Sequence, residues 1–314
     1  MVTSTTETGN ATFYFIGVTT GQSSAQRVFP QWMAALGRPD VQLKGVDCQI
    51  HDDPARYRQI VAEIKADPQA LGALITTHKV DLLDAARDLI DRLGHHAQLC
   101  DEVSCLAKRD GLLWGYAVDP VADGRALDAI LSARYFASTQ GELLSFGAGG
   151  AAVAVALHLL EKPNGADRPA RFTFVDIDRN RLTRVETLLA GINAPIEFQY
   201  LCHQRAAEND RLLAQMPPGT VVINATGMGK DRPGSPITAA AQFPHNGVAW
   251  ELNYRGELAF LQQALAQRET RQLTVADGWT AFLHGWTGVI AKVLDIDIDQ
   301  VTFDRLAVIA ASLR

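Results

Sequence analysis

One segment limits the possible folds of this chain more than any other. A short strand pattern, Glu142–Phe146, runs into a glycine-rich turn made of Gly147, Ala148, Gly149, Gly150 and Ala151, where an apolar helical pattern begins. Glycine allows a tight turn and a close approach of the backbone to a pyrophosphate, and the helix N-terminus offers free N–H groups to that anion. The segment therefore predicts a dinucleotide-binding Rossmann unit; the alternative is a tight turn that binds nothing.

Strand and helix patterns alternate along most of the chain. Thr12–Val18 and Arg171–Val175 have the composition of strands, whereas Pro54–Ala66 and Arg179–Ala190 have helical periodicity. Alternation of this kind predicts an α/β protein with a parallel sheet that is covered on both faces.

Three further predictions concern the region before the glycine-rich turn. Val80–Leu93 has the pattern of an amphipathic helix that ends at Gly94. Cys100–Ala107 and Leu112–Val118 are expected to pair as a β-ribbon, joined by a turn at residues 109–111. His95 and His96 are expected in a surface loop.

Composition excludes several classes of function. The chain has 314 residues, enough for two domains, and a formal net charge of −6 without a basic cluster, which argues against a nucleic-acid partner. No apolar run reaches membrane-spanning length, and the N-terminal residues, expected to be a frayed tail, lack a signal-peptide pattern. The four cysteines form no CxxC pair, which favours reduced thiols, a cytoplasmic location and no metal site.

Asp176 follows the second strand of the predicted Rossmann unit. An acidic residue at that position usually binds the ribose hydroxyls of NAD and repels the extra phosphate of NADP. The alternative role is a helix N-cap, which Asp178 could also fill. Arg179 and Arg181 could instead reach a 2′-phosphate, so NAD is the expected cofactor and NADP the alternative.

Five segments in this order resemble the shikimate/quinate dehydrogenase family. They are Ile75–Lys79, Gly115–Asp119, the glycine-rich turn at 147–152, the loop Asn224, Ala225, Thr226, Gly227 and Met228, and Asp277–Gly278. The resemblance implies a substrate-binding and catalytic domain at 1–119, completed by helices within 280–314, and a Rossmann domain at 120–279. It also implies that the loop at 224–228 contacts the cofactor.

The resemblance assigns the family's catalytic pair to Lys79 and Asp119. A lysine can take the hydroxyl proton while hydride leaves for the nicotinamide, and an aspartate can hold the ammonium group. The alternatives are a solvated lysine at a helix start and a capping aspartate before Pro120.

The expected substrate contacts fall on Ser23, Thr76, Thr77, Ser104, Tyr254 and His284. Several of these positions depart from the family pattern. Ala25 replaces a serine, Ser104 an asparagine, Gly285 a glutamine beside His284, and Ile177 an arginine of the cofactor side. A lost buried hydrogen bond costs about 1–3 kcal/mol, so these changes predict an altered substrate.

Together these features predict an NAD(P)-dependent dehydrogenase, a monomer or homodimer, that acts on a ring hydroxyl or ketone of a small hydroxy or keto acid. One alternative is true shikimate or quinate oxidation. Another is a dinucleotide-binding regulatory or sensor protein without efficient turnover.

Overall fold

The computed structural model describes residues 10–163, 165–192, 195–230 and 232–313, so the predicted frayed tail at residues 1–9 lies outside the described residues. The chain divides into two compact units. Unit 1 comprises residues 1–118 and 286–314, and unit 2 comprises residues 119–285. In the part of the chain that the structure describes, no helix has the length and apolarity to cross a membrane.

Unit 1 contains a mixed six-stranded sheet in the order β2-β1-β3-β5-β6-β4. Its strands are β1 (Ala11–Gly17), β2 (Val41–Asp47), β3 (Ala70–Ile75), β4 (Arg92–Leu93), β5 (Cys105–Arg109) and β6 (Leu112–Tyr116). The first three strands are parallel, and β5 pairs antiparallel with both β3 and β6. The predicted ribbon turn is confirmed, because Asp110 and Gly111 both take positive φ angles, +50° and +75°.

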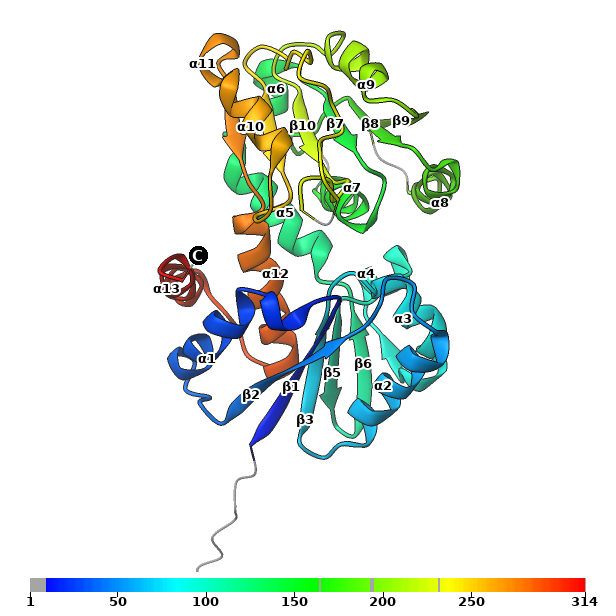
Figure 1. The fold of residues 1–314 in the computed structure, drawn as a ribbon, viewed down its shortest axis with the longest axis vertical. Helices are drawn as coiled ribbons and strands as arrows, with labels where there is room; N and C mark the ends of the chain where they lie inside the picture. The colour runs from blue at the N-terminus through cyan, green and yellow to red at the C-terminus, as the bar shows by residue number, and fades with distance from the viewer. Residues whose placement is uncertain (1–9, 164, 193–194, 231, 314) are drawn as a thin grey trace, which may run out of the picture. The chain divides into compact units, whose positions relative to one another are not determined.

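Helices cover both faces of this sheet (Figure 1). They are α1 (Ala25–Ala35), α2 (Pro54–Ala66), α3 (Lys79–Ala86), α4 (His95–Cys100), α13 (Gln300–Ala311) and the second half of α12 (Trp279–Leu294), with short 3₁₀ turns at Thr20–Gln22 and Arg87–Leu89. Trp286 of α12 packs against Phe13 and Phe15 of β1, and Trp32 of α1 donates a hydrogen bond to the Leu306 carbonyl at 2.8 Å. The C-terminal helices therefore complete the core of unit 1.

Three predictions in unit 1 are wrong. The helix expected at Val80–Leu93 ends at Ala86, because Arg92–Leu93 forms a short parallel strand with Trp114–Gly115. Gly94 then precedes a helix instead of ending one, and α4 replaces both the loop expected at His95 and the first part of the strand expected from Cys100. The secondary structure of this region depends on the pairing of β4 with β6, which is distant in the sequence, and local periodicity does not encode such pairing.

Unit 2 contains a fully parallel six-stranded sheet in the order β12-β11-β10-β7-β8-β9. Its strands are β7 (Leu143–Phe146), β8 (Arg171–Asp176), β9 (Glu197–Cys202), β10 (Val221–Asn224), β11 (Val248–Glu251) and β12 (Thr274–Ala276). Its helices are α5 (Asp119–Ile130), α6 (Tyr135–Thr139), α7 (Gly150–Glu161), α8 (Arg179–Leu189), α9 (Ala206–Leu213), α10 (Ala259–Ala266) and α11 (Arg268–Arg271). The chain proceeds outward from β7 to β9, returns to β10 beside β7, and proceeds outward again to β12. This is the Rossmann strand order, and the predicted α/β class is confirmed.

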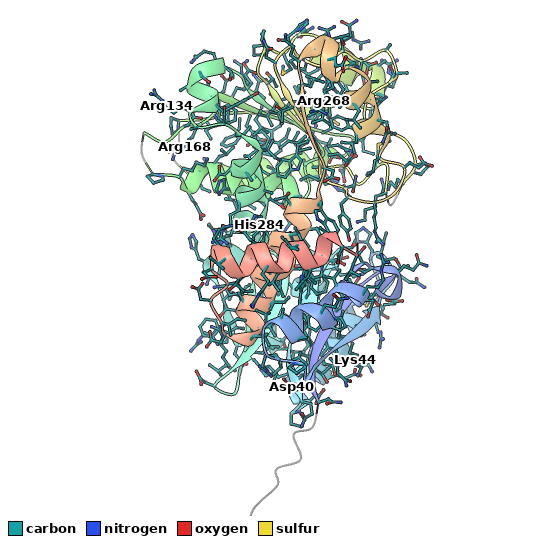
Figure 2. The ribbon with its side chains drawn as sticks, turned by 90° about the vertical axis from the view of Figure 1, so that its left-hand side faces the viewer. Asp40, Lys44, Arg134, Arg168, Arg268 and His284 are labelled. Carbon is teal, nitrogen blue, oxygen red and sulfur yellow. The ribbon has the colours of Figure 1, made fainter. Side chains whose placement is uncertain are left out.

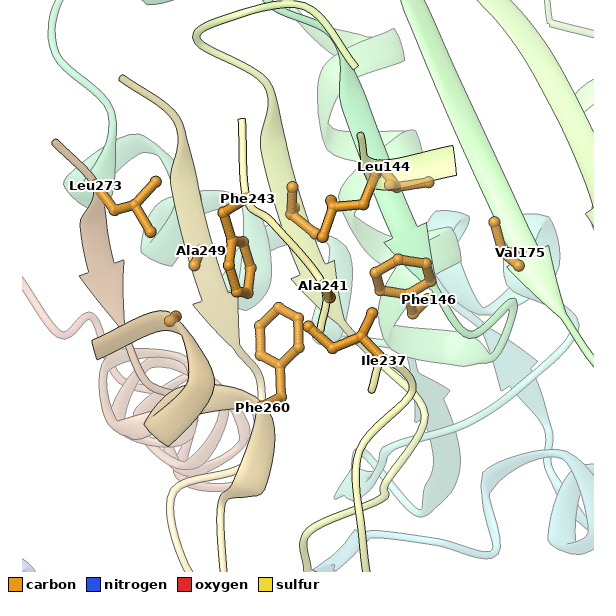
Figure 3. Close-up of a cluster of buried hydrophobic side chains, with 12 residues drawn as sticks. Leu144, Phe146, Val175, Ile237, Ala241, Phe243, Ala249, Phe260 and Leu273 are labelled. Carbon is orange, nitrogen blue, oxygen red and sulfur yellow. The ribbon is translucent and has the colours of Figure 1, made fainter. Parts of the chain in front are cut away.

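A buried apolar cluster fixes one face of this parallel sheet (Figure 3). Leu144 and Phe146 of β7 contribute to it from the sheet, and Phe243 and Phe260 cover them from the segment before β11 and from α10. The two phenylalanine rings of this cover meet edge to face at 5.3 Å. This packing holds the strands whose carboxyl ends form the site described next.

Candidate functional site

A cavity of about 350 Å³ lies at the carboxyl ends of the parallel strands of unit 2. Residues at and just after the ends of β7, β8, β9 and β10 line it; among them are Gly147, Asp176, Ile177, His203, Arg205, Ala225 and Thr226. This is the switch point between β7 and β10, where ligands bind in open α/β sheets. The volume is within the range of pockets for small molecules and cofactors.

Gly147 closes the turn between β7 and α7. Its φ angle is +99°, and a Cβ atom there would lie 2.5 Å from the carbonyl oxygen of Ala225. The Gly147 N–H donates to the Val175 carbonyl at 2.7 Å, and the Phe146 carbonyl accepts from the Ala225 N–H at 2.7 Å, so the turn is tied to both neighbouring strands. Only glycine fits at this position without moving the backbone.

Gly149 has a different role in the same turn. It is the N-cap residue of α7, and a Cβ atom built on it meets nothing within 4 Å. The backbone at the helix N-terminus is therefore open to a ligand, and the positive end of the helix dipole suits a phosphate there.

Asp176 links this turn to the end of β8. The carboxylate accepts hydrogen bonds from the backbone N–H groups of Ala148 and Asp178, both at 2.9 Å, and the residue is buried. Asp178 is the N-cap of α8, since its side chain accepts from the Asn180 N–H. The capping role thus belongs to Asp178, and Asp176 lies on the wall of the cavity.

The loop after β10 forms the opposite wall. The Asn224 side-chain oxygen accepts from both the N–H and the hydroxyl of Thr226, at 3.2 and 2.6 Å. The Thr226 hydroxyl in turn accepts from the Met228 N–H at 3.1 Å, and Gly227 takes a φ angle of +73°. Thr226 and Met228 line the cavity, so this internal network shapes the wall.

Three exposed arginines line the cavity as well. Arg181 is on α8, Arg205 immediately precedes α9, and Arg232 follows the loop at 224–229. Arg181 lies 3.9 Å from Asp178, and Arg205 lies 3.3 Å from Glu208. Guanidinium groups bind phosphate through paired N–H donors, so these side chains suit an anionic ligand.

A dinucleotide fits these residues. The cavity offers a carboxylate for ribose hydroxyls and apolar walls at Ile177 and Pro233 for an aromatic base, and Gly147 on its wall leads to the open N-terminus of α7, which suits a pyrophosphate. Ile177 is 60% exposed and lines the cavity, so its side chain is available to an aromatic base.

The predicted catalytic lysine lies in unit 1. Lys79 is the first residue of α3 and is half-buried, and its carbonyl accepts from the Val103 N–H at 3.2 Å. Thr76, at the end of β3, donates its hydroxyl to the Ile16 carbonyl at 3.2 Å, whereas Thr77 is exposed. His78 is buried with its Nδ1 2.8 Å from the Tyr57 hydroxyl, and burial lowers the pKa of its imidazole.

The two serines expected at the substrate both serve the fold of unit 1. The Ser104 hydroxyl is buried and accepts from the Val118 N–H at 2.9 Å, which holds the end of unit 1 next to β5. The Ser23 hydroxyl accepts from the Ala25 N–H at 3.3 Å at the start of α1. These contacts use the hydroxyls as acceptors and leave their role toward substrate a prediction.

Asp119, Tyr254 and His284 belong to unit 2. Asp119 is the first residue of α5, directly after Val118. The Tyr254 ring packs against Phe282 and Trp279 of α12, with centroids 4.5 and 5.7 Å apart. His284 is on α12 (Figure 2), and burial, followed by the charge of Arg125, lowers its pKa to about 4. The pairing of Lys79 with Asp119 stays a prediction.

Sequence reasoning missed part of this site. Arg205, Arg232 and His203 line the cavity, and Glu251 and Asn253 lie behind the loop at 224–229. His203 directly follows β9, so a search of strand ends could have found it, whereas the two exposed arginines carry no such signal. Glu251 ends a buried strand, and nothing in its neighbours distinguishes it from a surface acid.

No family model matches the chain. A curated relative, the shikimate dehydrogenase (NADP(+)) of Symbiobacterium thermophilum, is 27% identical over 235 residues, which cover 74% of this chain and 72% of the relative.

Solved structures share the fold over nearly the whole chain. A shikimate 5-dehydrogenase from Listeria monocytogenes, in complex with shikimate and NAD, has a TM-score of 0.71 at 16% identity, covering 96% of each chain. The Thermus thermophilus shikimate 5-dehydrogenase with NADP(H) and shikimate has a TM-score of 0.68 at 19% identity, covering 96% of this chain and 99% of that one. The 5-ketofructose reductase of Gluconobacter sp. strain CHM43 has a TM-score of 0.70 at 18% identity, covering 97% and 99%. In sequence and fold the chain is similar to shikimate dehydrogenases, and its unit 2 has the Rossmann strand order.

Proposed function

We propose that the chain is an NAD(P)-dependent oxidoreductase that transfers hydride reversibly between the nicotinamide and a ring hydroxyl or ketone of a small hydroxy acid. The observation that carries the proposal is the cavity at the switch point of a fully parallel sheet, with Gly147 on its wall and Gly149, the open N-cap of α7, two residues further along the same turn. The relatives support the same chemistry, since the curated relative is a shikimate dehydrogenase and a structural neighbour is a 5-ketofructose reductase.

The two units divide the work in this proposal. Unit 2 binds the dinucleotide, which supplies or accepts the hydride when bound. Lys79 of unit 1 removes the hydroxyl proton in oxidation and returns it in reduction, and the carboxylate of Asp119 orients the lysine ammonium group and stabilises its charge.

Both NAD and NADP suit the cavity. Asp176 favours NAD, because a carboxylate attracts ribose hydroxyls and repels a 2′-phosphate. Arg181, Arg205 and Arg232 favour NADP, because their positive charge would stabilise that phosphate. Because these features act in opposite directions, the ratio of the NAD affinity to the NADP affinity shows which of them dominates.

The substrate is expected to differ from shikimate. The side chain at Ser104 is shorter than the asparagine of the family, and its buried hydroxyl is hydrogen-bonded to the Val118 N–H. Ala25 and Gly285 also replace polar side chains, which leaves fewer donors for ring hydroxyls. The other polar groups proposed for substrate contact are Ser23, Thr76, Thr77, Tyr254 and His284. Shikimate or quinate itself is the second candidate, favoured by the name of the curated relative.

The test is a turnover assay with NAD and with NADP, followed by the absorbance of the reduced nicotinamide, over shikimate, quinate and other cyclic and acyclic hydroxy acids. Lys79→Ala is expected to abolish turnover and to leave dinucleotide binding unchanged, and Lys44→Ala on β2 (Figure 2) is the matched control. Full activity in Lys79→Ala would refute the catalytic pair. Dinucleotide binding without turnover of any substrate would favour the sensor alternative.

A further inference from the structure

A buried carboxylate lies behind the loop wall of the cavity. Glu251 ends β11, is 0% exposed, and pairs in register with Asn224 at the end of β10. Its hydrogen-bond partners among the described residues are three N–H groups: the Asn224 side-chain amide at 2.7 Å, and the side-chain amide and backbone N–H of Asn253 at 2.6 and 2.9 Å. The carboxylate therefore meets donors on both oxygens.

Each of the two asparagine amides also reaches the loop itself. The Asn224 Nδ2 donates to the Met228 carbonyl at 3.2 Å, and the Asn253 Nδ2 donates to the same carbonyl at 3.0 Å. One hydrogen of each amide thus points to Glu251 and the other to Met228. Because an ionised carboxylate can only accept, Glu251 in that form fixes which way both amides face.

The orientation of the Asn224 amide affects the cavity directly, through Thr226. With its Nδ2 turned to Glu251, Asn224 presents its oxygen to the N–H and hydroxyl of Thr226. Thr226 and Met228 line the cavity that we propose for the dinucleotide. We propose that Glu251 is a positioning residue of this site, which holds the loop at 224–229 in its binding shape through Asn224 and Asn253.

A purely stabilising role would not explain this residue. Removing a carboxylate from water costs several kcal/mol, and replacing a buried charged group by an apolar one is often neutral or stabilising. A fully connected polar network does, however, specify a single loop conformation, which a cofactor site requires. This inference rests on the proposed function in one respect only: the proposed function identifies the ligand of the loop as a dinucleotide.

Glu251→Gln is the informative variant because it keeps the size of the side chain and changes its hydrogen bonding. Glutamine can still accept from Asn253 through its oxygen, but its amide nitrogen then faces the Asn224 amide, donor against donor. We expect the KM for the dinucleotide to rise roughly tenfold with a smaller change in kcat. Glu142→Gln is the matched control, since Glu142 is a largely buried acid at the opposite end of the same sheet.

A second experiment exchanges the donor and the acceptor between Glu251 and Asn224. Asn224→Asp alone places two carboxylates face to face, whereas Asn224→Asp in the Glu251→Gln background restores a donor opposite an acceptor. The double variant is expected to bind the dinucleotide more tightly than the product of the two single effects predicts. Strictly additive effects would overturn the proposal. Glu251→Asp, one methylene shorter, replaces Glu251→Gln if the latter does not fold and should change the KM in the same direction.

Amide hydrogen exchange separates this inference from the proposed function, because it needs no cofactor. The N–H groups of Thr226 and Met228 are expected to exchange faster in Glu251→Gln, whereas those of β7 and β8 are expected to be unchanged. Unchanged exchange and unchanged KM would overturn the role of Glu251. Faster exchange in a protein whose wild type binds neither NAD nor NADP would uphold the role and refute the proposed ligand.

Discussion

The carboxylate of Asp176 holds the backbone N–H of Ala148 at 2.9 Å, and this bond joins the end of β8 to the glycine-rich turn after β7. Its other oxygen accepts from the Asp178 N–H at the start of the next helix. One side chain therefore fixes two backbone segments and faces the cavity.

Asp176→Ala removes the acceptor for two N–H groups and is expected to lower the free energy of unfolding by about 1–3 kcal/mol. NAD affinity should fall and discrimination against NADP should relax, because the carboxylate no longer contacts the ribose or repels a phosphate. Calorimetric titration with both dinucleotides measures this. Asp178→Ala, which loses a helix cap worth about 1 kcal/mol, is the control and should not alter the NAD/NADP ratio. A wild-type protein that already prefers NADP would contradict this interpretation of Asp176.

Two glycines of the same turn should respond in opposite ways to alanine. Gly147→Ala places a Cβ atom 2.5 Å from the Ala225 oxygen at a positive φ angle, so we expect a loss of about 2–4 kcal/mol in stability. Gly149→Ala meets no atom of the chain and should leave the melting temperature nearly unchanged while it weakens dinucleotide binding, because the methyl group occupies space next to the helix N-terminus. Unchanged binding in Gly149→Ala would place the pyrophosphate elsewhere.

Arg205 and Arg181 should matter more for NADP than for NAD. Arg205→Ala removes a guanidinium group from the cavity wall, and we expect a loss of about 1.4 kcal/mol, roughly tenfold, in NADP affinity and a smaller change for NAD. Arg268→Ala on α11 (Figure 2) is a matched control, because Arg268 does not line the cavity. Equal losses for both cofactors would show that Arg205 binds the shared pyrophosphate instead of the 2′-phosphate.

Glu251 should make stability depend on pH. Burial, opposed by the N–H donors of Asn253 and Asn224, raises its pKa from 4.5 to about 7. The folded protein then binds more protons than the unfolded chain between these values. The free energy of unfolding is therefore expected to fall as the pH rises from about 4.5 to 7, by an amount on the order of 3 kcal/mol, and to level off above. Urea denaturation of wild type and Glu251→Gln across this pH range measures the free energy of unfolding. If it changed with pH equally in both proteins, Glu251 would not be the cause of the pH dependence.

The sequence predicted the Rossmann unit well because its strands are short, apolar and bounded by turns. The glycine-rich turn, the helix at Pro54–Ala66 and the cap at Asp178 are all local features, each decided within a few residues. The helix α1 was not predicted, since Pro30 interrupts its pattern, and it forms because Phe29 and Trp32 pack against Trp286 far along the chain.

The site was predictable only where a strand end carries a recognisable turn. Asp176 and the loop at 224–228 could be found this way, and they meet around one cavity. Arg205 and Arg232 could not, because an exposed arginine has the same appearance in a sequence whether or not it faces a ligand. Glu251 was hidden for the opposite reason, since its importance comes entirely from the two amides that surround it.

The core of unit 1 is shared between the two ends of the chain, with Trp32 bonded to Leu306 and Trp286 packed on β1. On the ribosome, residues 286–314 emerge only after all of unit 2 has been made. Unit 2 is continuous from 119 to 285 and can fold while the apolar surface of β1 and α1 is still waiting for its cover. The nascent chain therefore lacks the partners of Phe13, Phe15 and Trp32 in residues 286–314 for the time needed to translate more than half of its length.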